Sequence, residues 1–177
     1  MDSKSLRYSN VGGRRLQGSD FSDRLTGNSS ANVMRGMKGN DVLRGDAGSD
    51  TLIGGTGADK LLGGAGKDTF VFDRTALDGV DQILDFSARD DTLRLDNALF
   101  TRLADGGVLA AQNYRENNTG TAGDANDFIL YNTRNGALSY DADGSGPGQA
   151  VRFATLYDGT GDHPGASQLA PLDFLIV

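Results

Sequence analysis

The chain has 177 residues, of which 37% are hydrophobic, and this length and apolar content suit one folded domain with a buried core. It carries 24 acidic and 17 basic residues, and the net charge of -7 argues against nucleic acid or an anionic membrane as the main partner, because like charges repel. Cysteine is absent and histidine occurs once, which excludes disulfides, thiolate metal sites, cysteine nucleophiles and zinc sites of two or three histidines within this chain.

Residues 1–8 are expected to form an N-terminal tail. The opening sequence MDSKSLRYSNVGGRR lacks the apolar stretch of an N-terminal signal peptide, and no run approaches the ~20 apolar residues of a membrane-spanning helix. We therefore expect no membrane span, and any export has to depend on another signal.

Residues 9–71 form seven consecutive units of nine residues, without insertion or deletion. The last two are GGTGADKLL (54–62) and GGAGKDTFV (63–71). From residue 18 onward the first position is glycine, the sixth is Asp or Asn, and the eighth is apolar. Glycine reaches backbone conformations closed to other residues, and the last three positions predict a short strand with one inward-facing side chain. Two units therefore make one coil of a parallel solenoid, with eighteen residues per coil.

These units resemble the calcium-binding nonapeptide of the repeats-in-toxin (hemolysin-type) family, whose repeats form a parallel β-roll. The resemblance covers residues 18–71 and is clearest from residue 36. It implies an all-β fold in which a β-roll of residues 9–71 continues into a β-rich C-terminal cap of residues 72–177. Short alternating runs in the cap, such as DQILDF, TLRLD and GALSYD, agree with this class.

The resemblance also implies where calcium binds. Calcium takes six to eight oxygen ligands, from carboxylates and backbone carbonyls, and in this family each ion lies between two stacked loops. Loops on one edge of the roll are eighteen residues apart, so loop 36–41 is expected to stack on loop 54–59, and loop 45–50 on loop 63–68. Two strong sites are implied, with the expected ligands Asp41 and Asp59 in one, Asp50 and Asp68 in the other, and the carbonyls of Gly36, Lys38, Gly45, Ala47, Gly54, Thr56, Gly63 and Ala65.

Earlier units depart from this pattern. Phe21 and Ser30 replace the glycine of the fourth position, and Arg14 stands where the first acidic residue is expected, so no site is predicted at Arg14. For Asp23 and for Asn32 two alternatives remain open: each contributes to a weaker calcium site, or no site forms there.

After residue 71 the nine-residue spacing ends. Asp81, with Asp78 and Asp85, either closes the last coil over loop 54–59 or belongs to a solvated turn. Together with the open sites of the earlier units, this gives an expected total of two to about five calcium ions.

Calcium is expected to drive folding. Without the ion, stacked aspartates repel one another, and glycine-rich loops lose much entropy on ordering. Binding to the folded state stabilises it, and calcium modules outside cells bind in the range of about 10⁻⁴–10⁻³ M. We therefore expect a repeat that is disordered in the cytosol and folds after export.

The residues PLDFLIV, 171–177, are similar to the C-terminal tail of type I secretion substrates that carry these repeats; a last β-strand of the cap is a compatible alternative. The resemblance implies a bacterial, secreted, extracellular module that uses the type I secretion apparatus and supports an attached N-terminal effector or catalytic domain. No GxSxG motif, P-loop or acid-base pair stands out, so we expect the chain itself to be non-catalytic.

An alternative function is binding of an anionic polysaccharide such as alginate, as part of a polysaccharide-modifying enzyme such as a mannuronan C5-epimerase. Eighteen-residue spacing places Arg24, Arg44 and Lys60 on one sheet face, which gives an acidic protein a local basic stripe. Solubilising charge on exposed strands is the competing interpretation.

Two cap segments carry their own predictions. The sequence DADGSG, 141–146, imitates the start of an EF-hand loop, but its twelfth position is Arg152, so a tight hairpin turn is expected, with weak calcium binding as the alternative. The polar stretch 111–126 is expected to be a mobile loop.

Overall fold

The computed structural model describes residues 7–9, 15–73, 75–104, 106–162 and 169–177. The prediction made for Arg14 lies outside these residues. In chain order the elements are β1 (Arg7–Ser9), β2 (Arg15–Gln17), β3 (Arg24–Asn28), β4 (Val33–Lys38), β5 (Val42–Asp46), β6 (Thr51–Thr56), β7 (Lys60–Leu62), β8 (Thr69–Phe72), β9 (Asp81–Ile83), β10 (Thr92–Leu95), β11 (Gly107–Val108), η1 (Ala111–Asn113), β12 (Tyr114–Asn117), β13 (Ile129–Asn132), β14 (Ala137–Tyr140), β15 (Val151–Leu156), η2 (Pro171–Asp173) and β16 (Phe174–Ile176).

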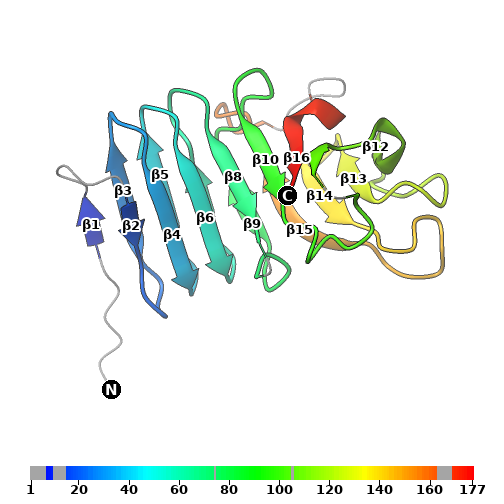
Figure 1. Ribbon diagram of the computed structural model, residues 1–177, viewed down its shortest axis with the longest axis horizontal. Helices are drawn as coiled ribbons and strands as arrows, with labels where there is room; N and C mark the ends of the chain where they lie inside the picture. Colours follow the sequence, from blue (N-terminus) through cyan, green and yellow to red (C-terminus); the bar gives the residue numbers. More distant parts are fainter. Residues whose placement is uncertain (1–6, 10–14, 74, 105, 163–168) are drawn as a thin grey trace.

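Strands alternate between two sheets, as expected for a β-roll. Among the described residues, one sheet has nine strands in the order β1-β3-β5-β7-β9-β15-β14-β13-β12, and the other has seven in the order β11-β16-β10-β8-β6-β4-β2. In the roll all neighbours are parallel, and Leu25 pairs with Leu43, which pairs with Leu61, so one coil takes eighteen residues. Figure 1 shows the roll strands from β1 onward, followed by the cap. The predicted all-β fold, a parallel roll that continues into a β-rich cap, is confirmed.

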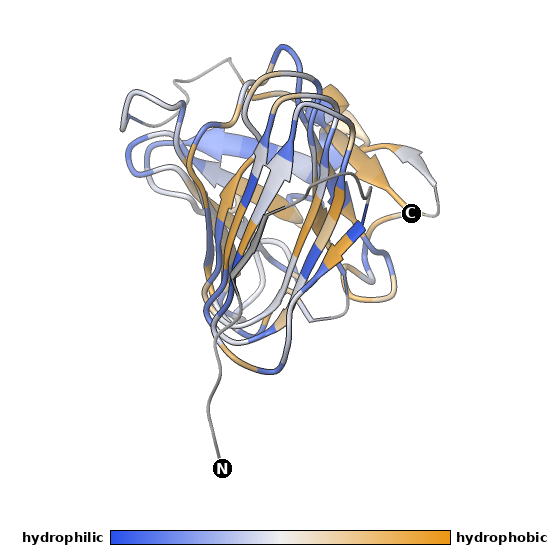
Figure 2. Cartoon of the chain, turned by 90° about the vertical axis from the view of Figure 1, so that its left-hand side faces the viewer, coloured by the Kyte–Doolittle hydropathy of each residue, from blue (hydrophilic) through white to orange (hydrophobic). Residues whose placement is uncertain are grey.

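The core of the roll is one side chain thick. The eighth-position side chains Leu25, Met34, Leu43, Leu52, Leu61 and Phe70 all have an exposed fraction of 0%. Figure 2 looks along the roll, with the two sheets facing one another and the loops at both edges. Each fully buried side chain contributes about 1.5–3 kcal/mol, but a coil supplies only two, so the loops at the edges have a large share in stability.

The stacking of coils does not stop at residue 71. Gln82 of β9 pairs with Lys60, and Thr92 of β10 pairs with Thr69, which adds one more coil to the roll. The offsets are 22 and 23 residues in place of 18, because residues 72–75 and Asp85 are inserted. Segments 76–84 (ALDGVDQIL) and 86–94 (FSARDDTLR) therefore follow the register of the repeat with little of its glycine.

The cap extends the nine-stranded sheet. β15 pairs in parallel with β9, and β14 and β13 follow as antiparallel neighbours. Aromatic rings fill the space between the sheets: Phe72 and Phe153 have ring centroids 4.9 Å apart, and Phe100 lies 5.2 Å from both Phe153 and Tyr140. Because Phe72 directly follows the repeat, roll and cap share one continuous core.

The C-terminal residues form a strand inside the seven-stranded sheet. β16 lies between β10, its parallel neighbour, and β11, its antiparallel neighbour. Phe174 and Ile176 are buried, whereas Leu175 points outward with an exposed fraction of 37%. In the folded protein, residues 174–176 therefore form the last strand of the cap, as one of the two interpretations of this tail predicts.

Two cap predictions need correction. The stretch 111–126 is not entirely a loop, because η1 and β12 lie within it, and Tyr114 pairs with Ile129 of β13. The segment 141–150 does connect an antiparallel hairpin, β14 to β15, but as a longer loop in which Asp143 accepts a hydrogen bond from the Gly148 N–H at 2.9 Å. Among the described residues, no helix has the length and apolar content that crossing a membrane requires.

Candidate calcium-binding loops

The loops at each edge of the roll stack as the sequence predicts. Met37 pairs with Gly55 and Lys38 with Thr56 on one edge, and Ala47 forms a parallel bridge with Ala65 on the other. Loop 36–41 thus lies on loop 54–59, and loop 45–50 on loop 63–68.

The sixth-position residues form one hydrogen-bonded ladder on each edge. The Asp41 N–H donates to Asp59 Oδ1 at 2.7 Å, and the Asp50 N–H donates to Asp68 Oδ1 at 2.8 Å. The ladders extend in both directions, with donor–acceptor pairs Asp23 to Asp41, Asn32 to Asp50, Asp59 to Asp81 and Asp68 to Asp91. Within the part of the chain that the structure describes, each ladder therefore has four members.

The middle two members of each ladder differ from the outer two. Among the described residues, the Oδ2 atoms of Asp41, Asp50, Asp59 and Asp68 are buried and have no hydrogen-bond partner. A buried carboxylate oxygen without a partner is strongly destabilising, and a native protein that keeps four of them requires an explanation. These are the four aspartates that the sequence singles out as calcium ligands.

Oxygens from two coils converge beside the first-position glycines. A Cβ atom on Gly36 would collide with Asp41 Oδ2 and with the carbonyl oxygen of Gly54 in the next coil, and one on Gly45 would meet Asp50 Oδ2 and the Gly63 carbonyl oxygen in the same way. A carboxylate oxygen and a carbonyl oxygen are ligands that calcium prefers, so the donor set fits this ion.

The backbone explains why the four Oδ2 atoms stay unpaired. In each of these loops the second and fourth positions have positive φ: 91° at Met37 and 112° at Gly39, for example, and 76° at Asp46 and 110° at Gly48. Non-glycine residues rarely adopt this left-handed conformation, which costs about 1–2 kcal/mol, and such strain is concentrated at functional sites. Among the described residues, loops 54–59 and 63–68 complete the set, with glycine at both positions.

In three other loops a backbone N–H donates a hydrogen bond to the sixth-position oxygen that is unpaired in the four loops above. The second-position N–H donates to the sixth-position side chain, from Ser19 to Asp23 Oδ2 at 2.5 Å and from Asn28 to Asn32 Oδ1 at 2.9 Å. Ser87 donates to Asp91 Oδ2 at 2.9 Å in the same manner. Asp23 and Asn32 therefore lie in the ladders, but the oxygen that would face a cation already accepts a hydrogen bond.

Burial disfavours the charged form of the ladder carboxylates and so raises their pKa values. It raises the pKa of Asp41 to about 7 and of Asp59 to about 6 from an ordinary value of 3.8, against the opposing effect of the N–H that each accepts. On the other edge burial raises the pKa of Asp50 to about 6, and it also raises that of Asp68. A bound cation would offset this burial and favour the charged form.

Among the described residues, no group of three or more acidic or histidine side chains is arranged to hold a metal ion. A cation here depends on backbone carbonyls for much of its coordination. Of the predicted carbonyls, those of Thr56 and Ala65 accept hydrogen bonds from the Gly39 and Gly48 N–H groups at 3.0 and 2.9 Å. Each carbonyl oxygen has two lone pairs, so one remains for a further partner.

The acidic residues after the repeat separate between the two edges. Asp81 Oδ1 accepts the Asp59 N–H at 3.0 Å, and the Asp78 carbonyl accepts the Gly57 N–H at 2.6 Å, so these two close the coil over loop 54–59. Asp85 instead lies at the other edge, over Gly63. Asp91 was missed, although the sequence Asp91-Thr92-Leu93 has the sixth, seventh and eighth positions of a repeat.

Comparison with known proteins agrees with this architecture. The family model for the RTX calcium-binding nonapeptide repeat (4 copies) matches residues 17–52 and 44–74. Residues 17–74 belong to the RTX calcium-binding repeat family. No curated protein matches the chain in sequence.

A solved structure shares the fold of the RTX roll and its cap. It is the solution structure of the AlgE6R3 subunit from the Azotobacter vinelandii mannuronan C5-epimerase, with 26% identity and a TM-score of 0.54. The match covers 94% of the present chain and 81% of that one. The likeness therefore extends from the RTX repeats into the cap.

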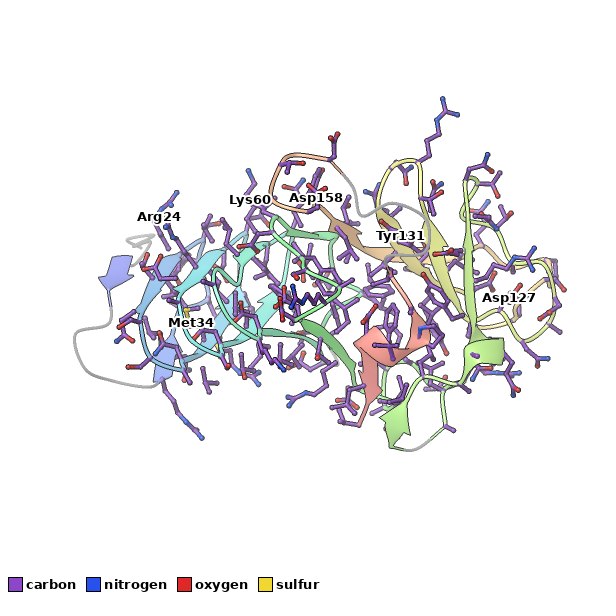
Figure 3. The ribbon with its side chains drawn as sticks, turned by 90° about the horizontal axis from the view of Figure 1, so that it is seen from above. Arg24, Met34, Lys60, Asp127, Tyr131 and Asp158 are labelled. Carbon is purple, nitrogen blue, oxygen red and sulfur yellow. The ribbon has the colours of Figure 1, made fainter. Side chains whose placement is uncertain are left out.

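The predicted basic stripe lies on the outer face of the nine-stranded sheet of the RTX roll. Arg24 pairs with Val42, which pairs with Lys60, and Arg44 lies on the same face of β5. All three basic side chains are exposed, and Figure 3 shows Arg24 and Lys60 on the same side of the molecule. Arg44 forms an ion pair with Asp46, with Nε and Oδ1 2.5 Å apart, which reduces the net charge of the stripe.

Proposed function

We propose that the chain is a calcium-dependent folding module in which RTX loops 36–41, 45–50, 54–59 and 63–68 hold the ions. The observation that carries the proposal is the set of four buried Oδ2 atoms, Asp41, Asp50, Asp59 and Asp68, that lack hydrogen-bond partners among the described residues. A bound calcium ion would be the positively charged partner that these four oxygens lack among the described residues. The chain's own part is to place carboxylate and carbonyl oxygens from successive coils beside the first-position glycines.

Circular dichroism of the full chain tests the proposal. In chelator we expect the spectrum of a largely unfolded chain, and on addition of ~1 mM calcium a β spectrum, because extracellular calcium modules bind in this range. Magnesium at the same concentration should not replace calcium, since it is smaller and demands near-octahedral geometry. A chain that is fully folded in chelator would contradict the proposal.

In a cell, such a module would serve an exported protein. Bacterial export through the type I secretion apparatus before folding, and stabilisation of an attached effector or catalytic domain after it, are supported by the RTX repeats and by the likeness of residues 171–177 to secretion tails. The RTX repeat is itself non-catalytic, and we assign no reaction to this chain. Export of a reporter fused to the chain, with and without residues 169–177, tests this role; equal export of both fusions argues against it.

A second candidate function is binding of an anionic polysaccharide by the outer face of the nine-stranded sheet. It is supported by the position of Arg24 and Lys60 in one row, and by the likeness to a subunit of an enzyme that acts on mannuronan. An extended polyanion lying across the strands would meet these cations in succession.

Calorimetry with alginate in saturating calcium tests this function. Replacing Arg24, Arg44 and Lys60 by Gln should weaken binding strongly. The matched control replaces Arg15, Arg35 and Arg134, which are exposed elsewhere on the molecule, by Gln and should have little effect. Equal affinities for both triple variants, or no binding by the unmodified chain, would exclude the basic stripe as the binding surface.

A further inference from the structure

The cap has a pocket of about 430 Å³ between two loops. The first loop connects β12 to β13 and contributes residues 120–122. The second connects β14 to β15 and contributes Asp141, residues 144–146 and residues 148–150, and Leu130 of β13 lies at the bottom. Figure 1 shows both loops at the end of the cap farthest from the roll. None of the functions proposed above uses these residues.

The pocket lies on the outer face of the nine-stranded sheet. Ile129 and Tyr131 belong to the core between the sheets, so Leu130 between them points outward. Its exposed fraction is nevertheless only 1%, as expected for a side chain that loops cover. Strand pairing relates this position to the basic stripe, through the successive residues Lys60, Gln82, Thr155, Ala137 and Asn132. The same face is thus basic over the roll and carries the pocket over the cap.

Side-chain hydrogen bonds hold the first loop in place. Asn117 Oδ1 accepts the Gly120 N–H, and Asn117 Nδ2 donates to the Thr121 carbonyl at 2.8 Å. Toward the other end of the loop, Asp127 Oδ2 accepts the Gly123 N–H at 2.7 Å. The wall that this loop forms is therefore fixed by its own residues.

The two loops are also fixed to one another. The Ser145 N–H of the second loop donates to the Asp124 carbonyl of the first at 3.0 Å. A Cβ atom on Gly144 would collide with the backbone of Ala125, so the close approach of the loops requires glycine here. The pocket is therefore preformed, and a ligand loses little free energy to the ordering of its walls.

The inner part of the pocket combines a buried carboxylate with aliphatic surface. Asp141 has an exposed fraction of 5%, and its Oδ1 accepts the Asp143 N–H at 3.3 Å. Leu130, Ala122 and Ala150 supply the aliphatic groups. Each carboxylate oxygen has more than one lone pair, so Asp141 can accept further hydrogen bonds from a ligand.

The charge at the pocket favours a cationic group. Burial raises the pKa of Asp141 above its ordinary value of 3.8, and the adjacent carboxylate of Asp143 raises it further. A positive group beside Asp141 would offset both effects. An anionic ligand would meet only repulsion, because none of the described residues that line the pocket is basic.

Two basic side chains near the cap loops have acceptors of their own. Arg115 is paired with Asp127, with Nη1 and Oδ2 3.6 Å apart. Arg152, at the start of β15, donates from Nη2 to Thr155 Oγ1. Neither arginine lines the pocket. The Asp141 carboxylate is thus left for a cation from outside the chain.

We propose that the cap pocket binds an arginine side chain of a partner protein, with its guanidinium group at Asp141 and its methylene groups along Leu130, Ala122 and Ala150. Arginine fits better than lysine, because its planar guanidinium has five donors in a fixed geometry. The Ser145 hydroxyl and the Gln149 amide at the exposed rim offer further acceptors to these donors.

The partner is therefore a protein with an exposed arginine on a basic surface, which suits the net charge of -7 of this chain. Binding of such a partner goes beyond calcium-dependent folding. It would give the cap, in which we identify no calcium-binding loop, a recognition role of its own.

The test uses the full chain in saturating calcium, after circular dichroism has shown that it is folded. The probe is Nα-acetyl-arginine N-methylamide, and the neutral Nα-acetyl-glutamine N-methylamide is the matched ligand. In amide NMR spectra we expect the arginine probe to shift signals of residues 120–122, 144–146 and 148–150, and the glutamine probe to leave them unchanged. Agmatine, a free amine with the same guanidinium group, distinguishes the source; binding of agmatine alone would overturn the assignment to a protein partner.

Asp141→Asn should weaken binding of the arginine probe about 10- to 100-fold, as expected for loss of a charged acceptor. Asp124→Asn is the control, because it removes the same charge from the first loop without altering a residue that lines the pocket. Its effect should stay below about 3-fold, since exposed charges interact weakly. Equal affinities of the two variants, or no binding by the unmodified chain, would overturn the inference.

These outcomes are separate from the proposed function, which fails if the chain does not fold on addition of calcium, before any probe is present. If Asp141→Asn does not fold, Ala122→Leu takes its place, because it fills part of the pocket and keeps Asp141. Loss of probe binding in Ala122→Leu supports the pocket as the site, and unchanged affinity overturns it. Loss of one bound calcium ion in Asp141→Asn, with probe binding unchanged, would also overturn the inference.

Discussion

The main-chain N–H of Asp41 donates a 2.7 Å hydrogen bond to Oδ1 of Asp59, eighteen residues further along the chain. This leaves Asp59 with one oxygen that connects two coils and another, Oδ2, that is buried without a partner among the described residues. The same carboxylate therefore takes part in coil stacking and is available to a cation. In the proposed function, calcium binding and stacking of the coils are coupled through this side chain.

Asp59→Asn separates these two contributions. Asn can keep the Oδ1 acceptor for the Asp41 N–H, but it removes the charge and the free oxygen. We expect calcium affinity to fall about 10- to 100-fold, since an interaction with a charged group is worth about 1.5–3 kcal/mol. The measurement is the calcium midpoint of the circular dichroism transition. Asp162→Asn, an exposed change in the cap, is the control, and equal midpoints for both variants would contradict the prediction.

Met37→Gly should stabilise the calcium-bound protein. Met37 has φ of 91°, which glycine adopts without strain, and the expected gain is about 1 kcal/mol. Ser19 holds the same position in loop 18–23, but its N–H donates to Asp23 and its φ is not positive. Chemical denaturation in calcium should therefore show a gain for Met37→Gly and none for Ser19→Gly. A gain of the same size at both positions would show that φ is not the cause.

The calcium-free protein should lose stability as pH rises. Burial raises the pKa of Asp41 to about 7 and of Asp81 to about 8, from 3.8 in the unfolded chain. Between pH 4 and 8 the folded state therefore binds more protons than the unfolded state, so the free energy of unfolding decreases with pH. The β signal of circular dichroism in chelator, which reports the folded fraction, is compared at pH 5 and at pH 8; a larger folded fraction at pH 8 would contradict the prediction.

Calcium should compete with these protons. Its affinity is expected to fall as pH drops below about 7, the pKa of Asp41, with release of protons on binding. Calorimetry at pH 7 in two buffers of different ionisation enthalpy detects the released protons. A binding enthalpy that is identical in both buffers would show that no proton is displaced.

Phe174→Ala tests the C-terminal strand. Phe174 is fully buried, and its ring lies 5.7 Å from that of Tyr114, so its removal should destabilise the cap by about 3–5 kcal/mol. Leu175→Ala, on the outward face of the same strand, should change the free energy of unfolding by much less. Thermal unfolding in saturating calcium makes the comparison, and similar losses for both variants would argue that β16 is not docked as described.

Much of the roll could be predicted from sequence, because glycine, aspartate and leucine recur at a fixed interval. That interval predicts the alternation of strands and the stacking of Asp41 on Asp59. Closure of the last coil by Asp81 was one of two alternatives, but the second strand of the added coil was not predicted, since five inserted residues shift its register, and Phe86 and Arg89 stand where the repeat has glycine. The pairings of Gln82 with Lys60 and of Thr92 with Thr69 reveal that the pattern resumes.

The difference between the loops could not be predicted from sequence either. Met37 and Ser19 occupy equivalent positions, and neither residue type indicates a left-handed backbone. The structure shows that one has positive φ and the other donates its N–H to the sixth-position side chain. In the proposed function, the loops that hold calcium are those with positive φ at the second position.

The alternation of strands between two sheets makes eighteen residues, and not nine, the step by which the roll can change length. Loss of a single nonapeptide would move every later loop to the opposite edge and every later strand to the other sheet. The two strands that connect the roll to the cap, β9 and β10, would then exchange sheets. β9 would lie beside β8, in the place that β10 occupies in the structure. Loss of two nonapeptides deletes one coil and preserves all that follows. Nonapeptides should therefore be gained or lost two at a time, both in natural variants of such a chain and in variants designed to be shorter.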